Sequence, residues 1–216
     1  MHRRVLGGVA ATLILALGTA ASETTTIARW SFDGRDAGAN SVEGAPGGRL
    51  ERAKAVEGHE GKALSFQDWS VVDYLKPDPG KATRVVIEHD DRLNPAAPFA
   101  LSAWINASSK PIYYGGIIEK GQGFGSSYRL LLLRDIRIEG SLGAGHATVR
   151  SPSPIELNRW IRVSLVVEGS ALSLLLDGKE VAREALGSDT RLESTAPILI
   201  GERFSGMIDE VTIEKR

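Results

Sequence analysis

Sixteen residues at the end of the sequence decide the fold: Gly201-Glu-Arg-Phe-Ser-Gly-Met-Ile-Asp-Glu-Val-Thr-Ile-Glu-Lys-Arg216. Alternate side chains of an extended strand point to the same face, which groups Met207, Asp209, Val211 and Ile213. Asp209 would then be a carboxylate among apolar residues. Because burying an unpaired carboxylate is costly, we expect backbone N–H groups, a basic side chain or a metal ion beside it.

The beginning of the sequence has the pattern of a secretory signal peptide. Arg3 and Arg4 precede an apolar run from Val5 to Leu17, and small residues follow at 18–22. This run of about thirteen residues is shorter than the roughly 20 that span a bilayer. We therefore predict that residues 1–22 are a signal peptide, that the mature chain has no membrane span, and that it is secreted or periplasmic.

Composition limits the remaining choices. Without Arg3 and Arg4, the basic residues fall from 26 to 24 against 27 acidic residues, which gives a net charge of about −3 and argues against nucleic acid as a partner. The sequence has no cysteine, so an exported chain of this kind relies on its core or on a bound metal. Residues 23–216 have a length typical of a single domain.

The mature sequence reads as many short strands. None of its segments shows a sustained helical period, and turns rich in Gly, Pro and Asp separate the apolar runs. Asp177-Gly178 is a strong hairpin signal, because glycine tolerates a positive φ. This pattern predicts an all-β sandwich. The expected strands are 26–33, 61–67, 83–88, 99–106, 116–120, 128–134, 136–142, 160–167, 171–176, 180–185, 198–200 and 207–213.

Six motifs follow one another in an order that resembles a known family. They are Trp30-Ser-Phe-Asp-Gly34, Gly61-Lys-Ala-Leu-Ser-Phe66, Phe99-Ala-Leu-Ser-Ala-Trp-Ile105, Trp160-Ile-Arg-Val163, Leu176-Asp-Gly-Lys179 and Ile200-Gly201 with Phe204-Ser-Gly-Met-Ile-Asp-Glu-Val211. Together they resemble the laminin G-like, concanavalin A-like jelly-roll family of secreted bacterial proteins. The resemblance implies a sandwich of two antiparallel sheets in which the first and last strands run side by side.

The resemblance also implies a structural Ca²⁺. In many relatives this ion lies at an edge of the sandwich, held by an aspartate near the start, by backbone carbonyls and by the aspartate of the last strand. The matching residues here are Asp33 and Asp209, with carbonyls near Gln67 and Asp68. The alternative is that Asp209 accepts hydrogen bonds from a neighbouring loop and that Asp33 caps a turn.

Two groups of aromatic residues are candidate ligand contacts. About sixteen residues, from Asp68 to Thr83, depart from the family pattern as an added loop that carries Trp69 and Tyr74. Tyr113, Tyr114 and Phe124 cluster around a Gly-rich hairpin, and aromatic faces suit sugar rings. The alternative is that these rings pack the loops onto the sandwich; Tyr128, Trp30 and Trp160 are candidates for the core.

Catalytic motifs are weak in this sequence. Some jelly rolls are hydrolases with a Glu-x-Asp-x-Glu strand, but Glu88-His-Asp90-Asp-Arg92 has Arg in place of the last acid. The histidines have no zinc-site spacing. We therefore predict a non-catalytic recognition domain that binds a polysaccharide or an extracellular protein surface. The alternatives are a glycan-active hydrolase or lyase with an unrecognised site, and a purely structural or adhesive module.

Overall fold

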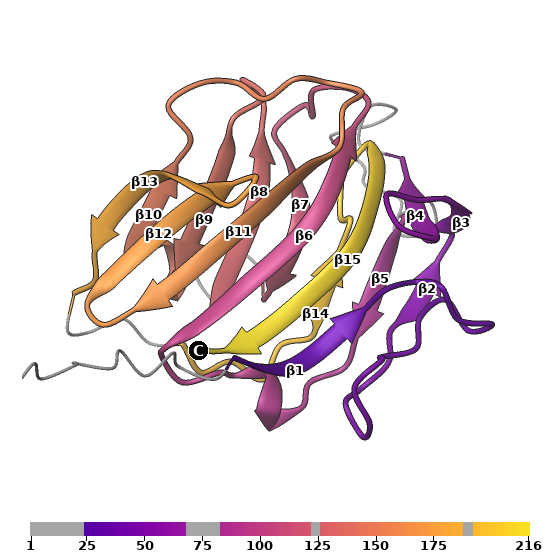
Figure 1. Ribbon diagram of the computed structural model, residues 1–216, viewed down its shortest axis with the longest axis horizontal. Coiled ribbons are helices and arrows are strands. Elements are labelled where there is room, and N and C mark those ends of the chain that lie inside the picture. Colours follow the sequence, from indigo (N-terminus) through magenta and orange to yellow (C-terminus); the bar gives the residue numbers. More distant parts are fainter. Residues whose placement is uncertain (1–23, 68–82, 122–125, 188–191) are drawn as a thin grey trace, which may run out of the picture.

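The computed structural model describes residues 24–67, 83–121, 126–187 and 192–216. Its strands form two antiparallel sheets packed face to face, which confirms the predicted jelly-roll sandwich (Figure 1). The described helical elements are two short 3-10 turns, η3 (Asp91–Leu93) and η5 (Gly143–Gly145). Within this part of the chain, we find no helix with the length and hydropathy that a membrane crossing requires.

The two sheets contain eight and seven strands. The eight-stranded sheet has the order β13 (Lys179–Ala185), β12 (Ala171–Leu176), β11 (Ile161–Glu168), β6 (Phe99–Ala107), β15 (Gly206–Lys215), β4 (Lys62–Phe66), β3 (Lys54–Glu57), and β1 (Thr25–Trp30) pairs with β15. The seven-stranded sheet has the order β10 (Ala147–Arg150), β9 (Ile138–Leu142), β8 (Tyr128–Leu133), β7 (Tyr114–Lys120), β14 (Ile198–Ile200), β5 (Arg84–Ile87), β2 (Arg49–Glu51).

The first and last strands lie side by side, as the resemblance implies. β1 pairs with β15 in a register that places Trp30 opposite Val211. On its other side β15 pairs with β6, and near its start it also pairs with β4. Figure 1 shows β15 between β6 and β1, with the C-terminus beside the start of β1. The closing strand therefore joins segments from both ends of the sequence.

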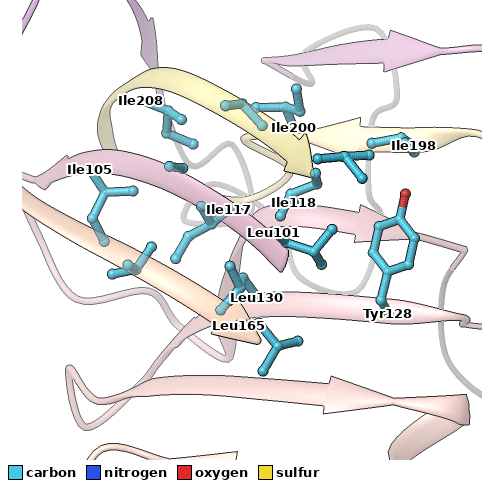
Figure 2. Close-up of a cluster of buried hydrophobic side chains, with 14 of the residues drawn as sticks. Leu101, Ile105, Ile117, Ile118, Tyr128, Leu130, Leu165, Ile198, Ile200 and Ile208 are labelled. Carbon is cyan, nitrogen blue, oxygen red and sulfur yellow. The ribbon is translucent and has the colours of Figure 1, made fainter. Parts of the chain in front are cut away.

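The core lies between the sheets and follows the alternation of the strands. In β6, Phe99, Leu101 and Ile105 face the core, while Trp104 points to the outer face of the sheet and is half-buried. Figure 2 shows Leu101 and Ile105 packed with isoleucines and leucines from β7, β8, β11, β14 and β15. Tyr128 is fully buried, and its hydroxyl donates a hydrogen bond to the Leu93 carbonyl (3.1 Å).

The predicted side-chain phase of the last strand is wrong before Val211. The pairing of β15 with β6 shifts between Asp209 and Thr212, and Glu210 has φ of 51°. A β-bulge inserts a residue and reverses the alternation beyond it. Ile208 therefore joins Val211 and Ile213 in the core, whereas Asp209 lies opposite Trp104 on the outer face.

The local sequence explains most of the other elements. Asp177 and Gly178 both have positive φ (49° and 78°) and form the predicted turn between β12 and β13. Residues 50–56, which fit either a strand or irregular structure, contribute to β2 and β3. The short strand β10 was not predicted; its alternating burial is confined to four residues.

Candidate functional site

An aromatic cleft lies beside the outer face of the eight-stranded sheet. The His59 ring stacks on Trp104, with ring centroids 3.7 Å apart and 13° between the planes, and it meets Trp160 edge-on at 5.8 Å. Both tryptophans are half-buried and His59 is exposed. The cleft measures about 500 Å³, and its lining residues are His59, Trp104, Arg159, Trp160, Arg162, Asp177 and Gly178.

The neighbouring strands β11, β6 and β15 form the sheet surface beneath this cleft. Trp104 of β6 pairs with Arg162 of β11 on one side and with Asp209 of β15 on the other. Directly opposed residues on adjacent strands share a face, so these three side chains form a row across the outer face. A cation and a carboxylate thus lie on either side of the central tryptophan.

Asp209 holds the turn that carries His59. This turn connects β3 to β4, and its His59 and Glu60 N–H groups donate to Asp209 Oδ2 (3.0 and 3.1 Å). The Glu210 N–H donates to Oδ1 (2.8 Å). Asp209 has no exposed surface, and burial raises its pKa although the three N–H donors act in the opposite direction. Backbone N–H groups are therefore the partners of the buried carboxylate.

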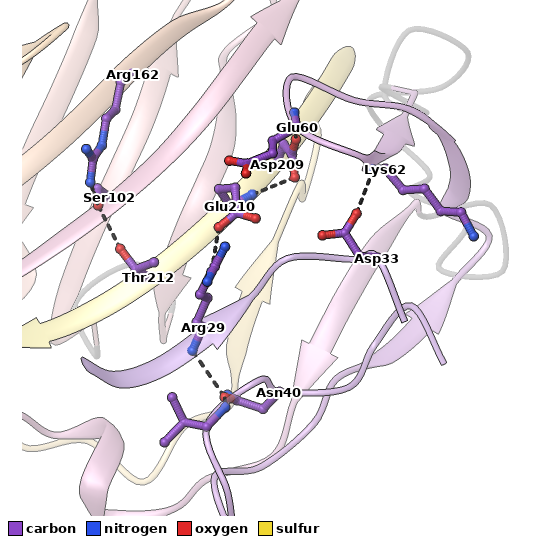
Figure 3. Close-up of polar contacts among 11 residues, drawn as sticks. Arg29, Asp33, Asn40, Glu60, Lys62, Ser102, Arg162, Asp209, Glu210 and Thr212 are labelled. Atoms are coloured by element: carbon purple, nitrogen blue, oxygen red, sulfur yellow. Dashed lines mark hydrogen bonds and ion pairs between the residues drawn. The ribbon is translucent and has the colours of Figure 1, made fainter. Parts of the chain in front are cut away.

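Asp33 binds the same turn at its other end. Its Oδ1 accepts a hydrogen bond from the Lys62 N–H (2.7 Å). Gly61 has φ of 59°, and a Cβ there would lie 2.2 Å from Asp33 Oδ1, so a larger residue would displace the carboxylate. Figure 3 shows that Asp33, in the segment after β1, and Asp209, on β15, approach the turn from different parts of the chain. The two aspartates predicted to act together therefore meet at one turn.

The opposite wall of the cleft comes from the hairpin of β12 and β13. Asp177 Oδ1 accepts a hydrogen bond from the Arg162 N–H (2.9 Å), and the Asp177 N–H donates to the Arg162 carbonyl (2.8 Å). These two bonds fix the hairpin turn against the start of β11. The Asp177 carboxylate therefore has a structural partner.

A tight loop positions Trp160 directly before β11. Asn158 has φ of 59°, a left-handed conformation that asparagine tolerates better than most residues. Its N–H donates to the Ala107 carbonyl at the end of β6 (2.8 Å). This contact ties the loop to the strand that carries Trp104. Trp160 was a candidate for the core in the sequence, but its ring lines the cleft.

The aromatic residues predicted as ligand contacts lie elsewhere. Tyr113 is 45% exposed and lines a different cleft of about 490 Å³ with Leu133, Arg134 and Asp135. Tyr114 is half-buried, and its hydroxyl accepts a hydrogen bond from Arg203 Nη1 (3.2 Å) while the Arg203 guanidinium lies over its ring. Trp69, Tyr74 and Phe124 lie outside the described residues.

The predicted calcium ligands do not form an oxygen cage in the described part of the chain. A calcium ion requires six to eight oxygen ligands, whereas two N–H groups face Asp209 Oδ2. Within the described ranges, no group of three or more His, Cys, Asp or Glu side chains is arranged to hold a metal. Hydrogen bonds from a loop, the alternative left open by the sequence, account for the buried Asp209. A calcium ion at this edge stays a prediction.

A second, more polar cleft lies near the segment 88–92. It measures about 730 Å³ and is lined by His89, Asp91, Asn94, Glu193, Ser194 and Thr195. His89 Nδ1 lies 3.2 Å from Lys120 Nζ, and His89 Nε2 lies 3.2 Å from the exposed carboxylate of Asp91. Asp90 pairs with Arg92 (2.8 Å), and the hydrogen bonds from Arg92 lower the pKa of Asp90. Asp90 is therefore held in an ion pair with Arg92, which is a structural role.

Sequence reasoning missed most of the aromatic cleft. His59, Arg159, Arg162 and Asp177 were not among the predicted site residues. The one available signal was Trp104, which the alternation of residues 99–106 places away from the core. A single apolar side chain on an outer face is common, so Trp104 alone did not identify the cleft.

Comparison with known proteins agrees with this architecture. The fold is a two-sheet jelly-roll β-sandwich. A family model for the concanavalin A-like lectin/glucanases superfamily matches residues 79–216, more than half of the sequence. The chain therefore belongs to this superfamily. Strands β1, β3 and β4 precede the matched segment but lie in the same eight-stranded sheet as β15.

Solved structures show the same fold at low sequence identity. Domain 4 of AbnA, a GH43 extracellular arabinanase from Geobacillus stearothermophilus solved in complex with arabinotriose, is 13% identical with a TM-score of 0.66, over 90% of this chain and 94% of that chain. The botulinum neurotoxin serotype D binding domain is 12% identical with a TM-score of 0.66, over 87% of this chain and 47% of that chain. The chain thus spans about half of the toxin binding domain. A comparison with curated protein sequences finds no match.

Proposed function

We propose that the protein is a non-catalytic recognition domain that binds carbohydrate at the aromatic cleft. The observation that carries this proposal is the arrangement of Trp104, His59 and Trp160 around one opening on the outer face of the eight-stranded sheet. Aromatic rings provide large, rigid apolar faces, and the C–H groups of a sugar ring pack well against such faces. Arg159, Arg162 and Asp177 at the same opening supply polar groups for sugar hydroxyls.

The chemistry of the cleft favours binding over hydrolysis. Hydrolysis by two carboxylates requires an acid and a second carboxylate on either side of the scissile bond. Among the described lining residues, Asp177 is the one carboxylate, and it already accepts the Arg162 N–H. Among its described lining residues, the cleft therefore has no acid pair of the kind that a two-carboxylate hydrolase uses.

Two of the similar solved structures also support binding of carbohydrate. The arabinanase domain was solved in complex with arabinotriose, and a related botulinum neurotoxin binding domain was solved in complex with SialylT. The proposal also includes export, because the pattern of residues 1–22 is that of a signal peptide. A protein surface outside the cell is the second class of partner that such a domain would meet.

The test is a glycan-array screen followed by calorimetric titration with the best oligosaccharide. Trp160→Ala and Trp104→Ala should each weaken binding by about 2 kcal/mol, roughly 30-fold, because buried tryptophan contacts dominate binding energies. Tyr113→Ala removes an exposed aromatic ring at a different cleft and is the control, with unchanged affinity expected. Absence of binding across polysaccharides, or loss of binding only in Tyr113→Ala, would contradict the proposal.

A further inference from the structure

We infer that the aromatic cleft selects saccharides that carry an anionic group, a carboxylate or a sulfate on the sugar ring. This inference rests on the proposed function and adds the class of ligand. Its basis is the presence of two arginines at one opening with a single carboxylate, which accepts a hydrogen bond from the backbone. The sequence as a whole has a net charge of −1, so this positive site is local.

Arg162 has the better placement for an anion. It lies opposite Trp104 on the adjacent strand, and Figure 3 shows its side chain reaching toward Ser102. Its Nη2 donates to Ser102 Oγ (3.3 Å), and Ser102 Oγ in turn lies 2.7 Å from Thr212 Oγ1. A single long hydrogen bond orients the guanidinium and leaves further N–H donors. An arginine fork binds carboxylate or sulfate oxygens in a bidentate manner.

Arg159 adds a second positive charge at the rim. Its contact with Glu156 is long (3.4 Å), and both side chains are more than 60% exposed. Such exposed pairs contribute little and exchange readily with water. Arg159 can therefore turn from Glu156 to a ligand at little cost.

The one acid among the described lining residues cancels only part of this charge, because two arginines and one aspartate leave a net charge of about +1. Asp177 accepts the Arg162 backbone N–H and fixes the hairpin turn, so its carboxylate points to the backbone of β11. The larger cleft near His89 provides the contrast, because Asp91 and Glu193 both line it. The two clefts thus differ in charge, and only the one with stacked aromatic rings has two arginines.

Titration with matched ligands tests this inference. The probes are uronic acid trisaccharides (galacturonate, glucuronate, mannuronate and guluronate), their uncharged methyl esters, and sulfated and unsulfated galactan trisaccharides. We expect an anionic ligand to bind at least about tenfold more tightly than its neutral counterpart, since charge-assisted hydrogen bonds are about twice as strong as neutral ones. The uronate and sulfate arms identify which anionic group is preferred. Affinity should also fall as salt rises.

Variants at Arg162 test whether this residue is responsible for the preference for anionic ligands. Arg162→Gln should lower the affinity for the anionic ligand about tenfold or more, and it should lower the affinity for the methyl ester by a clearly smaller factor, because the ester loses only neutral hydrogen bonds. Arg162→Lys keeps the charge without the fork and should lie between the two. Arg183→Gln is the matched control, because Arg183 lies exposed on β13 of the same sheet and contacts Glu180. Melting curves of each variant are the control for correct folding.

Two results would overturn the inference, and they are distinguishable. Equal binding of charged and neutral ligands, with no effect of Arg162→Gln, would remove the anion preference and leave carbohydrate binding intact. Binding of none of the trisaccharides, together with a negative glycan array, would remove the proposed function and the inference with it.

Discussion

Asp209 and Glu119 are both buried carboxyl groups, but their surroundings differ. Each has no exposed surface. Asp209, on the eight-stranded sheet, accepts three backbone N–H hydrogen bonds. Glu119, on β7 of the seven-stranded sheet, has no hydrogen-bond partner for either oxygen within the described part of the chain. The two residues differ in their role: backbone donors let Asp209 hold a turn in place, whereas Glu119 holds no neighbouring segment through hydrogen bonds in the described part of the chain.

Because Glu119 has no hydrogen-bond donor beside it in the described part of the chain, burial favours its protonated, neutral form. Burial raises the pKa of Glu119 to about 8; the nearby Glu202 adds to this shift, and Arg129 and Arg203 oppose it. At neutral pH the group is therefore mostly uncharged, which removes most of the cost of burying it. Asp209 instead directs its oxygens to the turn that places His59 over Trp104.

The largest effect is expected at Asp209. Asp209→Ala leaves three N–H groups without an acceptor and should lower the free energy of unfolding by about 3 kcal/mol. Urea denaturation at neutral pH measures this loss. Asp33→Ala is the control: Asp33 is exposed and accepts one N–H of the same turn, so its loss should cost about 1 kcal/mol. Equal small losses in both variants would show that the turn does not depend on Asp209.

Glu119 should make the stability of the fold depend on pH. Its folded pKa of about 8 exceeds the ordinary value of 4.5, so the folded state retains a proton that the unfolded state releases. The contribution of Glu119 to stability should therefore be greatest below about pH 4.5 and fall by up to about 1.4 kcal/mol per pH unit until about pH 8.

The variant Glu119→Gln isolates this contribution. Because this variant has no ionisable group at position 119, its stability relative to the wild type should increase steadily from pH 5 to pH 8. Melting temperatures across that range provide the measurement. A constant difference between the two proteins at every pH would mean that Glu119 is ionised in the fold, and the contrast with Asp209 would then disappear.

The smallest effect concerns calcium. If Asp33 and Asp209 hold an ion as the resemblance implies, EDTA lowers the melting temperature and Asp209→Asn removes that sensitivity. The N–H donors that surround Asp209 make us expect a small change or none. A large EDTA effect that excess calcium reverses would show that the turn rearranges around a metal.

Much of the sandwich could be predicted from local patterns. Alternation in residues 99–106 identified both the core face of β6 and the outward Trp104, and Asp177-Gly178 identified a hairpin. The bulge at Glu210 could not be predicted, because it depends on the register with β6 and not on the strand itself. The error in phase placed Asp209 on the wrong face, although backbone N–H groups, one of the three kinds of partner expected, do lie beside it.

The cleft was harder to predict for a related reason. His59, Trp104 and Trp160 are far apart in the sequence, and no local pattern links them. They meet because β15 pairs with both β4 and β6 while β11 pairs with β6. Only this long-range pairing brings the turn of His59 over the central tryptophan.

A crystal structure with the tightest-binding oligosaccharide would show whether the aromatic cleft is the recognition site. We expect a sugar ring packed against Trp160 and His59, with an anionic group facing Arg162. A sugar bound instead beside Tyr113 and Arg134, or in the polar cleft of His89 and Glu193, would contradict it.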